Sequence, residues 1–75
     1  MNVNEFVDAI SREFGFSEAE SRRIFDFFIK TIVDQLNQGK EVKIRNFGTF
    51  KRYETKDGKS IPKFYASKNF FQENV

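Results

Sequence analysis

The sequence predicts an α+β fold with two N-terminal helices, a short antiparallel β-sheet and a short C-terminal helix. Three observations predict it. Apolar residues recur at helical spacing as far as about Asn37, apolar and basic residues then alternate from Val42 to Arg45, and a turn at Lys56-Asp57-Gly58 separates two extended runs. With 75 residues and no cysteine, the chain is expected to form a single domain, 1–75, near the lower size limit for a stable core.

The first helix is expected to begin after Asn2, whose side chain can cap it together with Glu5 three residues later. Gly15 is suited to end the helix in a left-handed conformation. Between these two ends, apolar residues at helical spacing form one stripe: Val3, Phe6, Val7, Ile10 and Phe14.

A second capping box, Ser17-Glu18-Ala19-Glu20, predicts a long helix that runs to about Asn37 and stops at Gly39. Its apolar residues cover roughly two thirds of the circumference, so it needs two packing surfaces. A second copy of the chain is favoured as one of them, because the eleven phenylalanines are hard to cover within one small subunit. The alternative is a helix held between the first helix and the sheet of one subunit. The expected dimer core is Phe25, Phe28, Ile29, Ile32, Phe47, Phe50 and Phe64.

The first strand is predicted from about Glu41 to Arg45, and the second runs to about Thr55. Phe47 and Phe50 are an odd number of residues apart, so both cannot face the core in an unbroken strand. We therefore expect a bend at Asn46-Phe47-Gly48 with a bulge at Gly48.

Two registers are open for the next hairpin. A two-residue loop at Asp57-Gly58 would place Phe50 opposite Tyr65, whereas a three-residue loop with Gly58 left-handed places Phe50 opposite Phe64 and Lys51 opposite Lys63. The second register keeps both phenylalanines on the core face and is preferred.

Pro62 makes the third strand an edge strand, since proline cannot donate a ladder hydrogen bond. After it, Ser67 is expected to cap a last helix from Lys68 to Val75, with Phe70, Phe71 and Val75 turned inward.

Charge is distributed unevenly along the chain. Residues 1–39 carry a net charge of −3, whereas residues 40–68 hold nine basic residues against three acidic ones, a net of +6. This asymmetry predicts a polyanionic partner for the second half. The alternative is a solvated sheet edge protected by its lysines.

The sequence contains no glycine-rich phosphate loop, no histidine and no cysteine, so we expect neither an enzyme nor a metal or cofactor site. Glu18, Glu20, Asp26 and Asp34 are better explained by helix capping and surface ion pairing than by catalysis. No apolar run approaches membrane-spanning length, which predicts a soluble, cytoplasmic protein with no membrane partner. A small-molecule substrate is not expected either.

The combination of Val42-x-Ile44-x-x-Phe47-Gly48-Thr49-Phe50, then Ile61-Pro62-x-Phe64, after two helices resembles the bacterial histone-like HU and integration host factor family over essentially the whole chain. The resemblance implies an intertwined dimer whose basic sheet forms a saddle for DNA. It also implies that Lys68 and Arg45 lie at DNA-contacting positions. Family members extend the sheet into a long arm with an Arg-Asn-Pro tip that kinks DNA. Here only ten residues, 51–60, separate Phe50 from Ile61, so the arm is truncated and proline-driven kinking is not expected.

The sequence therefore predicts a non-specific, nucleoid-associated DNA-binding protein that holds the phosphate backbone of double-stranded DNA and forms a dimer, expected to be a homodimer. Two alternatives stay open: a dimeric protein-interaction or assembly module that uses Tyr53 and Ile61, and a protein that binds RNA or structured DNA. The expected DNA-binding residues are Lys43, Arg45, Lys51, Arg52, Lys56, Lys59, Lys63 and Lys68.

Overall fold

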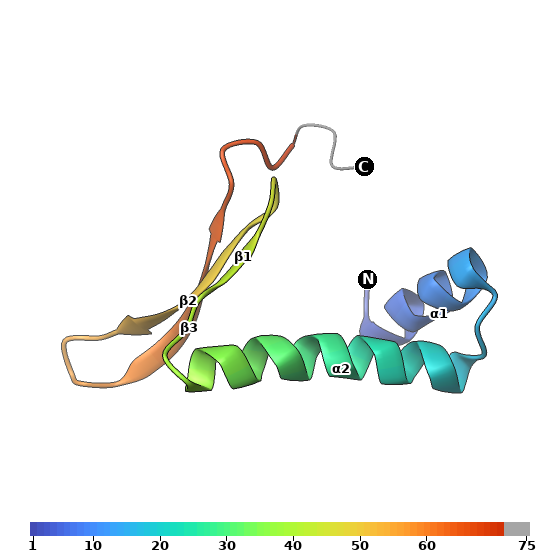
Figure 1. The fold of residues 1–75 in the computed structure, drawn as a ribbon, viewed down its shortest axis with the longest axis horizontal. Helices are drawn as coiled ribbons and strands as arrows, with labels where there is room; N and C mark the ends of the chain where they lie inside the picture. Colours follow the sequence, from blue (N-terminus) through green and yellow to red (C-terminus); the bar gives the residue numbers. More distant parts are fainter. Residues whose placement is uncertain (72–75) are drawn as a thin grey trace. The chain divides into compact units, whose positions relative to one another are not determined.

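Two helices are followed by a three-stranded antiparallel sheet, which confirms the predicted α+β class (Figure 1). The computed structural model describes residues 1–71. The chain divides into two compact units, one of Met1–Thr31 and one that begins at Ile32. The elements are α1 (Val3–Phe14), α2 (Glu18–Asn37), β1 (Val42–Ile44), β2 (Gly48–Glu54) and β3 (Ser60–Ala66).

Helix α1 begins and ends at the predicted residues. The Asn2 side chain accepts a hydrogen bond from the Glu5 backbone N–H at 2.9 Å, and the Asn2 N–H donates to the Glu5 carboxylate at 3.4 Å, which completes the capping box. At the other end, Gly15 adopts φ 70° and donates to the Ser11 carbonyl. A residue with a Cβ is disfavoured in that left-handed conformation, so glycine ends the helix there.

Helix α2 also has the predicted capping box. The Ser17 hydroxyl accepts from the Glu20 N–H at 3.1 Å, and both the N–H and the hydroxyl of Ser17 donate to the Glu20 carboxylate. These bonds lower the pKa of Glu20 because they favour its charged form. Helix α2 ends at Asn37, and Gly39 follows with φ 77°, as predicted.

Within the first unit, α1 packs on the N-terminal part of α2 through an aromatic contact and a polar one. The rings of Phe6 and Phe25 lie 5.1 Å apart, and Arg22 donates to the Asn4 side chain at 2.7 Å. Val7 is buried, and so is Ser21, whose hydroxyl finds no partner among the described residues. The first unit thus has a small core of its own.

The second unit contains the sheet, in the order β1-β2-β3. Phe50 lies opposite Phe64, and Lys51 lies opposite Lys63, so the preferred register is confirmed. The β2–β3 turn closes with hydrogen bonds from Thr55 to Lys59 and from Gly58 to Thr55, and Gly58 has φ 81°. Strand β3, which contains Pro62, is an edge strand as predicted.

The predicted bulge at Gly48 is wrong. Gly48 is the first residue of β2 and pairs regularly with Ile44 and Ala66, while the turn lies before it, closed by a hydrogen bond from Phe47 to Ile44 with Asn46 at φ 62°. Because Phe47 belongs to this turn, the alternation of the strand does not constrain its side chain. Strand β1 is accordingly shorter than predicted and ends at Ile44.

Gly48 is required for a different reason, the close approach of a neighbouring ring. A Cβ at this position would lie 2.5 Å from the ring of Phe64 and 2.6 Å from the Tyr65 carbonyl oxygen. The missing side chain lets Phe64 lie across β2, where its ring is 5.2 Å from that of Phe47 and 4.9 Å from that of Phe50.

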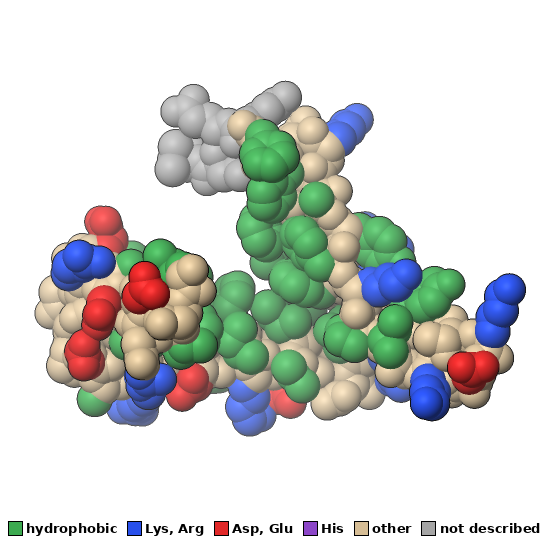
Figure 2. Space-filling view, turned by 180° about the vertical axis from the view of Figure 1, so that it is seen from behind, with side chains coloured by type: hydrophobic (Ala, Val, Ile, Leu, Met, Phe, Trp, Pro, Cys, Tyr) green, Lys and Arg blue, Asp and Glu red, His purple; other side chains and the backbone are tan. Residues whose placement is uncertain are grey.

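The face of the sheet that carries these rings, the inner face, is covered only in part by the chain itself. Phe64 stays 41% exposed and Phe47 stays 37% exposed. Large hydrophobic side chains of α2, among them Phe28 and Val33, are also exposed, and Figure 2 shows hydrophobic surface on both units.

Neither helix within residues 1–71 is long and apolar enough to cross a membrane.

The predicted last helix falls partly outside the described residues. Residues 68–71 form a turn, in which Phe70 donates to the Ser67 carbonyl and the Ser67 hydroxyl accepts from the Asn69 N–H. Phe70 contacts the Phe47 ring at 5.2 Å, as expected of an inward residue, but Phe71 is 97% exposed. The remainder of the predicted helix, 72–75, lies beyond the residues that the structure describes.

Candidate nucleic-acid interface

Three lysines from three strands share the face of the sheet opposite the phenylalanines. Lys43 pairs with Thr49, and Lys51 pairs with Lys63, so strand alternation turns all three lysines the same way. We call this surface the outer face; its residues are Lys43, Thr49, Lys51, Tyr53, Ile61, Lys63 and Tyr65.

Two tyrosines lie close to the ammonium groups of two of the three outer-face lysines. Lys63 Nζ lies 4.0 Å from the centre of the Tyr53 ring, and Lys51 Nζ lies 5.8 Å from the centre of the Tyr65 ring. The negative face of an aromatic ring attracts a cation, so each lysine of the directly opposed pair gains a favourable neighbour. Tyr65 was not among the predicted site residues, although its spacing of two from Lys63 places both on one face.

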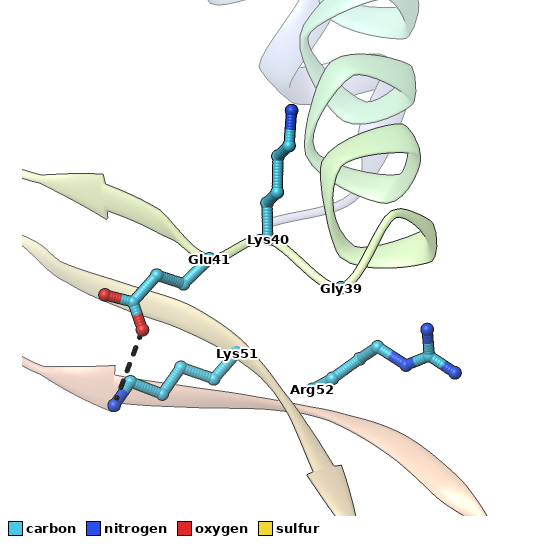
Figure 3. Close-up of a pocket in the computed structure, with 5 residues that line it drawn as sticks. All are labelled: Gly39, Lys40, Glu41, Lys51 and Arg52. Carbon is cyan, nitrogen blue, oxygen red and sulfur yellow. Dashed lines mark ion pairs between the residues drawn. The ribbon is translucent and has the colours of Figure 1, made fainter.

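Glu41 bridges two of the lysines from the segment before β1. Its Oε1 lies 3.5 Å from Lys43 Nζ, and its Oε2 lies 3.5 Å from Lys51 Nζ. Figure 3 shows Glu41 reaching toward Lys51. Both residues line an open hollow of about 530 Å³, together with Gly39, Lys40 and Arg52. Sequence reasoning missed this carboxylate as a member of the site.

Strand alternation places Arg52 on the inner face, opposite the three lysines. Figure 3 shows its side chain pointing away from that of Lys51. Its Nη1 donates to the carbonyls of Leu36 and Asn37 at 3.5 and 3.4 Å, and its Nη2 donates to the Ser60 hydroxyl at 3.1 Å. The Ser60 hydroxyl in turn donates to the Glu54 carboxylate at 3.0 Å. A cation at a helix C-terminus satisfies the free carbonyls there, so Arg52 ties the β2–β3 hairpin to the end of α2.

The other predicted DNA-binding residues are exposed but lie off the outer face. Lys56 and Lys59 occupy the β2–β3 turn, while Arg45 lies in the β1–β2 turn and Lys68 follows β3. The hydrogen bond from Ser67 to the Phe47 carbonyl brings the last two segments to the same end of the sheet. The structure therefore gathers Lys43, Lys51 and Lys63 and leaves the rest as separate cations around them.

The residues predicted for a dimer core fall into both units. Phe25 and Phe28 belong to the first unit, where Phe25 contacts Phe6 and Phe28 is 53% exposed. Phe47, Phe50 and Phe64 form the aromatic cluster of the inner face. Ile29 of the first unit is 43% exposed, and Ile32 of the second is half-buried.

Within residues 1–71, no cluster of three or more acidic, histidine or cysteine residues has the geometry to hold a metal ion.

Comparisons with known proteins identify the family of the chain. The family of bacterial DNA-binding proteins matches residues 1–61. DNA-binding protein HRL18 from Rhizobium leguminosarum is 28% identical over 83 aligned positions that cover 91% of each chain. Integration host factor subunit alpha from Xylella fastidiosa is 37% identical over 46 positions, which cover 61% of this chain and 46% of that protein.

Solved structures show the same fold. A point mutant of HU from Thermotoga maritima is 28% identical with a TM-score of 0.80, and 93% of each chain is covered. HU from Anabaena, in a cocrystal structure with DNA, is 21% identical with a TM-score of 0.77 over 93% of this chain and 92% of that one. From the family match, the relatives and the fold together, the chain belongs to the family of bacterial DNA-binding proteins that includes HU and integration host factor.

Proposed function

We propose that this chain is a non-specific, histone-like DNA-binding protein that contacts the phosphate backbone through the outer face. The observation that carries the proposal is the gathering of Lys43, Lys51 and Lys63 on one face of the antiparallel sheet. Lysine contacts to phosphate carry no direct sequence information, so binding of this kind is expected to be non-specific and salt-dependent. The role places the protein on the bacterial nucleoid in the cytoplasm, and it needs no catalytic group.

The working form in this proposal is a homodimer. Its support is the apolar surface that one chain leaves open in each unit: Phe28 is 53% exposed and Phe64 is 41% exposed. Apolar rings of this size are normally covered in a stable protein. A second copy would also supply a second outer face, which doubles the number of lysines that one duplex can contact. Sedimentation over a range of protein concentrations tests the dimer.

Bending by an inserted proline is not part of the proposal. The β2–β3 hairpin ends in the ordinary turn Lys56-Asp57-Gly58, and Pro62 lies within the ladder opposite Arg52. A wedge that kinks DNA has to project between base pairs. With no such residue at the hairpin tip, we expect contact with the backbone and little or no kinking, and DNA cyclisation or energy-transfer assays measure this.

The experiment that tests the function is fluorescence anisotropy of a labelled duplex titrated at several salt concentrations. We expect affinity to fall log-linearly with salt, with a slope of about −0.9 per phosphate contact, and to depend little on sequence. The variant K51Q/K63Q should weaken binding and flatten the slope. The matched control is R12Q/R23Q, which removes the same charge from the first unit. Equal effects of the two variants, or no duplex binding by the folded dimer at low salt, would contradict the proposal.

A protein-interaction module is the second candidate, and one observation favours it. Tyr53 and Ile61 lie opposite each other on the outer face and stay 44% and 39% exposed. Because Tyr53 also holds Lys63, its removal would disturb both functions, whereas I61S changes only the apolar contact. Unchanged DNA binding by I61S together with loss of a protein complex would favour this candidate. Competition by RNA and by junction DNA separates duplex binding from recognition of a preformed shape.

A further inference from the structure

Glu41 places a negative charge within the lysine cluster of the outer face. One carboxylate bridges Lys43 and Lys51, with an oxygen 3.5 Å from each ammonium nitrogen. The surface would bind a polyanion more tightly without this negative charge. Exposed ion pairs also contribute little to folding stability. The position of Glu41 therefore calls for an explanation other than stability.

We propose, on the basis of the function proposed above, that Glu41 is an internal competitor of DNA phosphate. Its carboxylate occupies the place between Lys43 and Lys51 that a backbone phosphate takes when DNA binds. Both groups are anions that offer two oxygens to two ammonium groups, so they satisfy the same pair of lysines. DNA has to displace Glu41 before it gains these two contacts.

The local structure allows this displacement. Glu41 precedes β1 and lies outside the regular strand pairing, which begins at Val42. The side chains of the bridge are open to solvent, with exposed fractions of 75% for Lys43, 50% for Lys51 and 41% for Glu41. A phosphate can therefore approach the lysines from outside while the glutamate side chain rotates away. The strand register holds Lys43 and Lys51 on the outer face throughout.

The consequence is weaker binding of DNA at low salt. In the free protein, the two lysines are partly neutralised by Glu41 rather than by salt anions. Binding then releases fewer counterions than it would if all three outer-face lysines were unpaired. Both the affinity for DNA and its salt dependence are therefore reduced. Glu41 thus regulates the strength of the site without contributing a contact to DNA.

The matched variants E41Q and E54Q test the proposal on the full-length chain. Both remove one negative charge from the same sheet, but Glu54 lies on the inner face, where its carboxylate accepts from Ser60. The amide oxygen of glutamine can keep that hydrogen bond. In duplex titrations at low salt, we expect E41Q to bind about two- to fivefold more tightly than the unchanged chain, with a steeper salt slope, whereas E54Q changes affinity by much less. Equal gains for both variants would reflect net charge alone and would overturn the proposal.

A second comparison isolates the bridge. In a K43Q/K51Q background the carboxylate has no lysines to occupy, so adding E41Q should give no gain beyond that of E54Q. A gain of the same size as in the unchanged chain would overturn the proposal.

Inorganic tripolyphosphate separates failure of this inference from failure of the proposed function. It is titrated into the same variants, and the backbone amide NMR shifts of Lys43 and Lys51 are followed. Suppose that the unchanged chain binds no duplex, yet E41Q binds tripolyphosphate more tightly than E54Q. This result would support the phosphate site and contradict the proposed DNA-binding function. If the chain binds the duplex but E41Q and E54Q do not differ with either ligand, the result would support the DNA-binding function and contradict the role of Glu41.

Discussion

Lys51 and Lys63 lie directly opposite each other in the β2–β3 ladder, and each ammonium group lies over a tyrosine ring of the opposite strand. Two like charges in this position repel each other and destabilise a sheet. The diagonal contacts with Tyr65 and Tyr53 offset this repulsion. The free protein can therefore keep a pair of cations ready for an anion.

The contact between Tyr53 and Lys63 makes the first prediction. At 4.0 Å from the ring centre, Lys63 Nζ is within the range of a cation–π interaction, which is worth about 0.5–1 kcal/mol at an exposed site. Y53L should lower the free energy of unfolding in urea by about that amount, whereas Y53F, which keeps the ring, should change it little. A loss as large in Y53F would assign the effect to the hydroxyl and contradict the role of the ring.

Arg52 makes the second prediction, because its guanidinium joins the hairpin to the end of α2. R52K keeps the charge but cannot reach the Leu36 and Asn37 carbonyls and the Ser60 hydroxyl together. We expect R52K to lower the free energy of unfolding by about 1–2 kcal/mol and to speed amide hydrogen exchange at the C-terminal end of α2. K56R is the control exchange at an exposed turn position. Normal exchange protection of α2 in R52K would show that this cap is dispensable.

Gly48 makes the third prediction. A methyl group there would lie 2.5 Å from the Phe64 ring and 2.6 Å from a backbone carbonyl oxygen. G48A should destabilise the protein by about 1–3 kcal/mol, as measured by urea unfolding, because both neighbours have to shift. F64L removes the ring, so the double variant G48A/F64L should be more stable than the sum of the two single effects predicts. Strict additivity would mean that the carbonyl, and not the ring, sets the requirement for glycine.

The strand register, the turn before Gly48 and the two helix starts show how much of the fold the sequence predicts. The register was predictable because Phe50 and Phe64 had to share the apolar face, and only one loop length allows that. The bulge at Gly48 was predicted wrongly because Phe47 was assumed to lie in the strand. Phe47 instead lies in a turn with Asn46 in the left-handed region, so strand alternation does not fix the direction of its side chain. Both helix starts followed from local capping chemistry, which depends on residues only three positions apart.

Partners within the site were harder to predict. Arg52 was assigned to DNA on its charge, although its spacing of two from Phe50 already placed it on the inner face. Its partners on α2 are 15 and 16 residues away, and the tertiary fold decides that contact. Glu41 lies near two lysines only because β1 and β2 are paired, so its bridge required the structure.

Ser21 makes the fourth prediction. Its side chain is fully buried, and its hydroxyl has no hydrogen-bond partner among the described residues. A buried polar group without a partner costs stability, so S21A should leave the free energy of unfolding unchanged or raise it by up to about 1 kcal/mol. S21L, which adds volume at a fully enclosed position, should destabilise the protein by about 1–3 kcal/mol. A clear loss of stability in S21A would show that the hydroxyl does have a partner.

Two glutamates in the first turn of α2 make the last prediction, because their pKa values shift in opposite directions. A hydrogen bond with Asp8 and the repulsion between the two carboxylates raise the pKa of Glu18. The contribution of Glu18 to stability is therefore fully present below its unfolded-state pKa. It is lost as the pH rises through the folded-state pKa. Hydrogen bonds from Ser17 lower the pKa of Glu20, so its contribution is present above the unfolded-state pKa and is lost as the pH falls through the folded-state pKa. At neutral pH, E18Q should therefore raise the melting temperature and E20Q should lower it. In acid, where carboxyl groups are protonated, the benefit of E18Q and the loss in E20Q should both shrink. Shifts of the same sign at neutral pH would contradict the assignment of repulsion to Glu18 and of capping to Glu20.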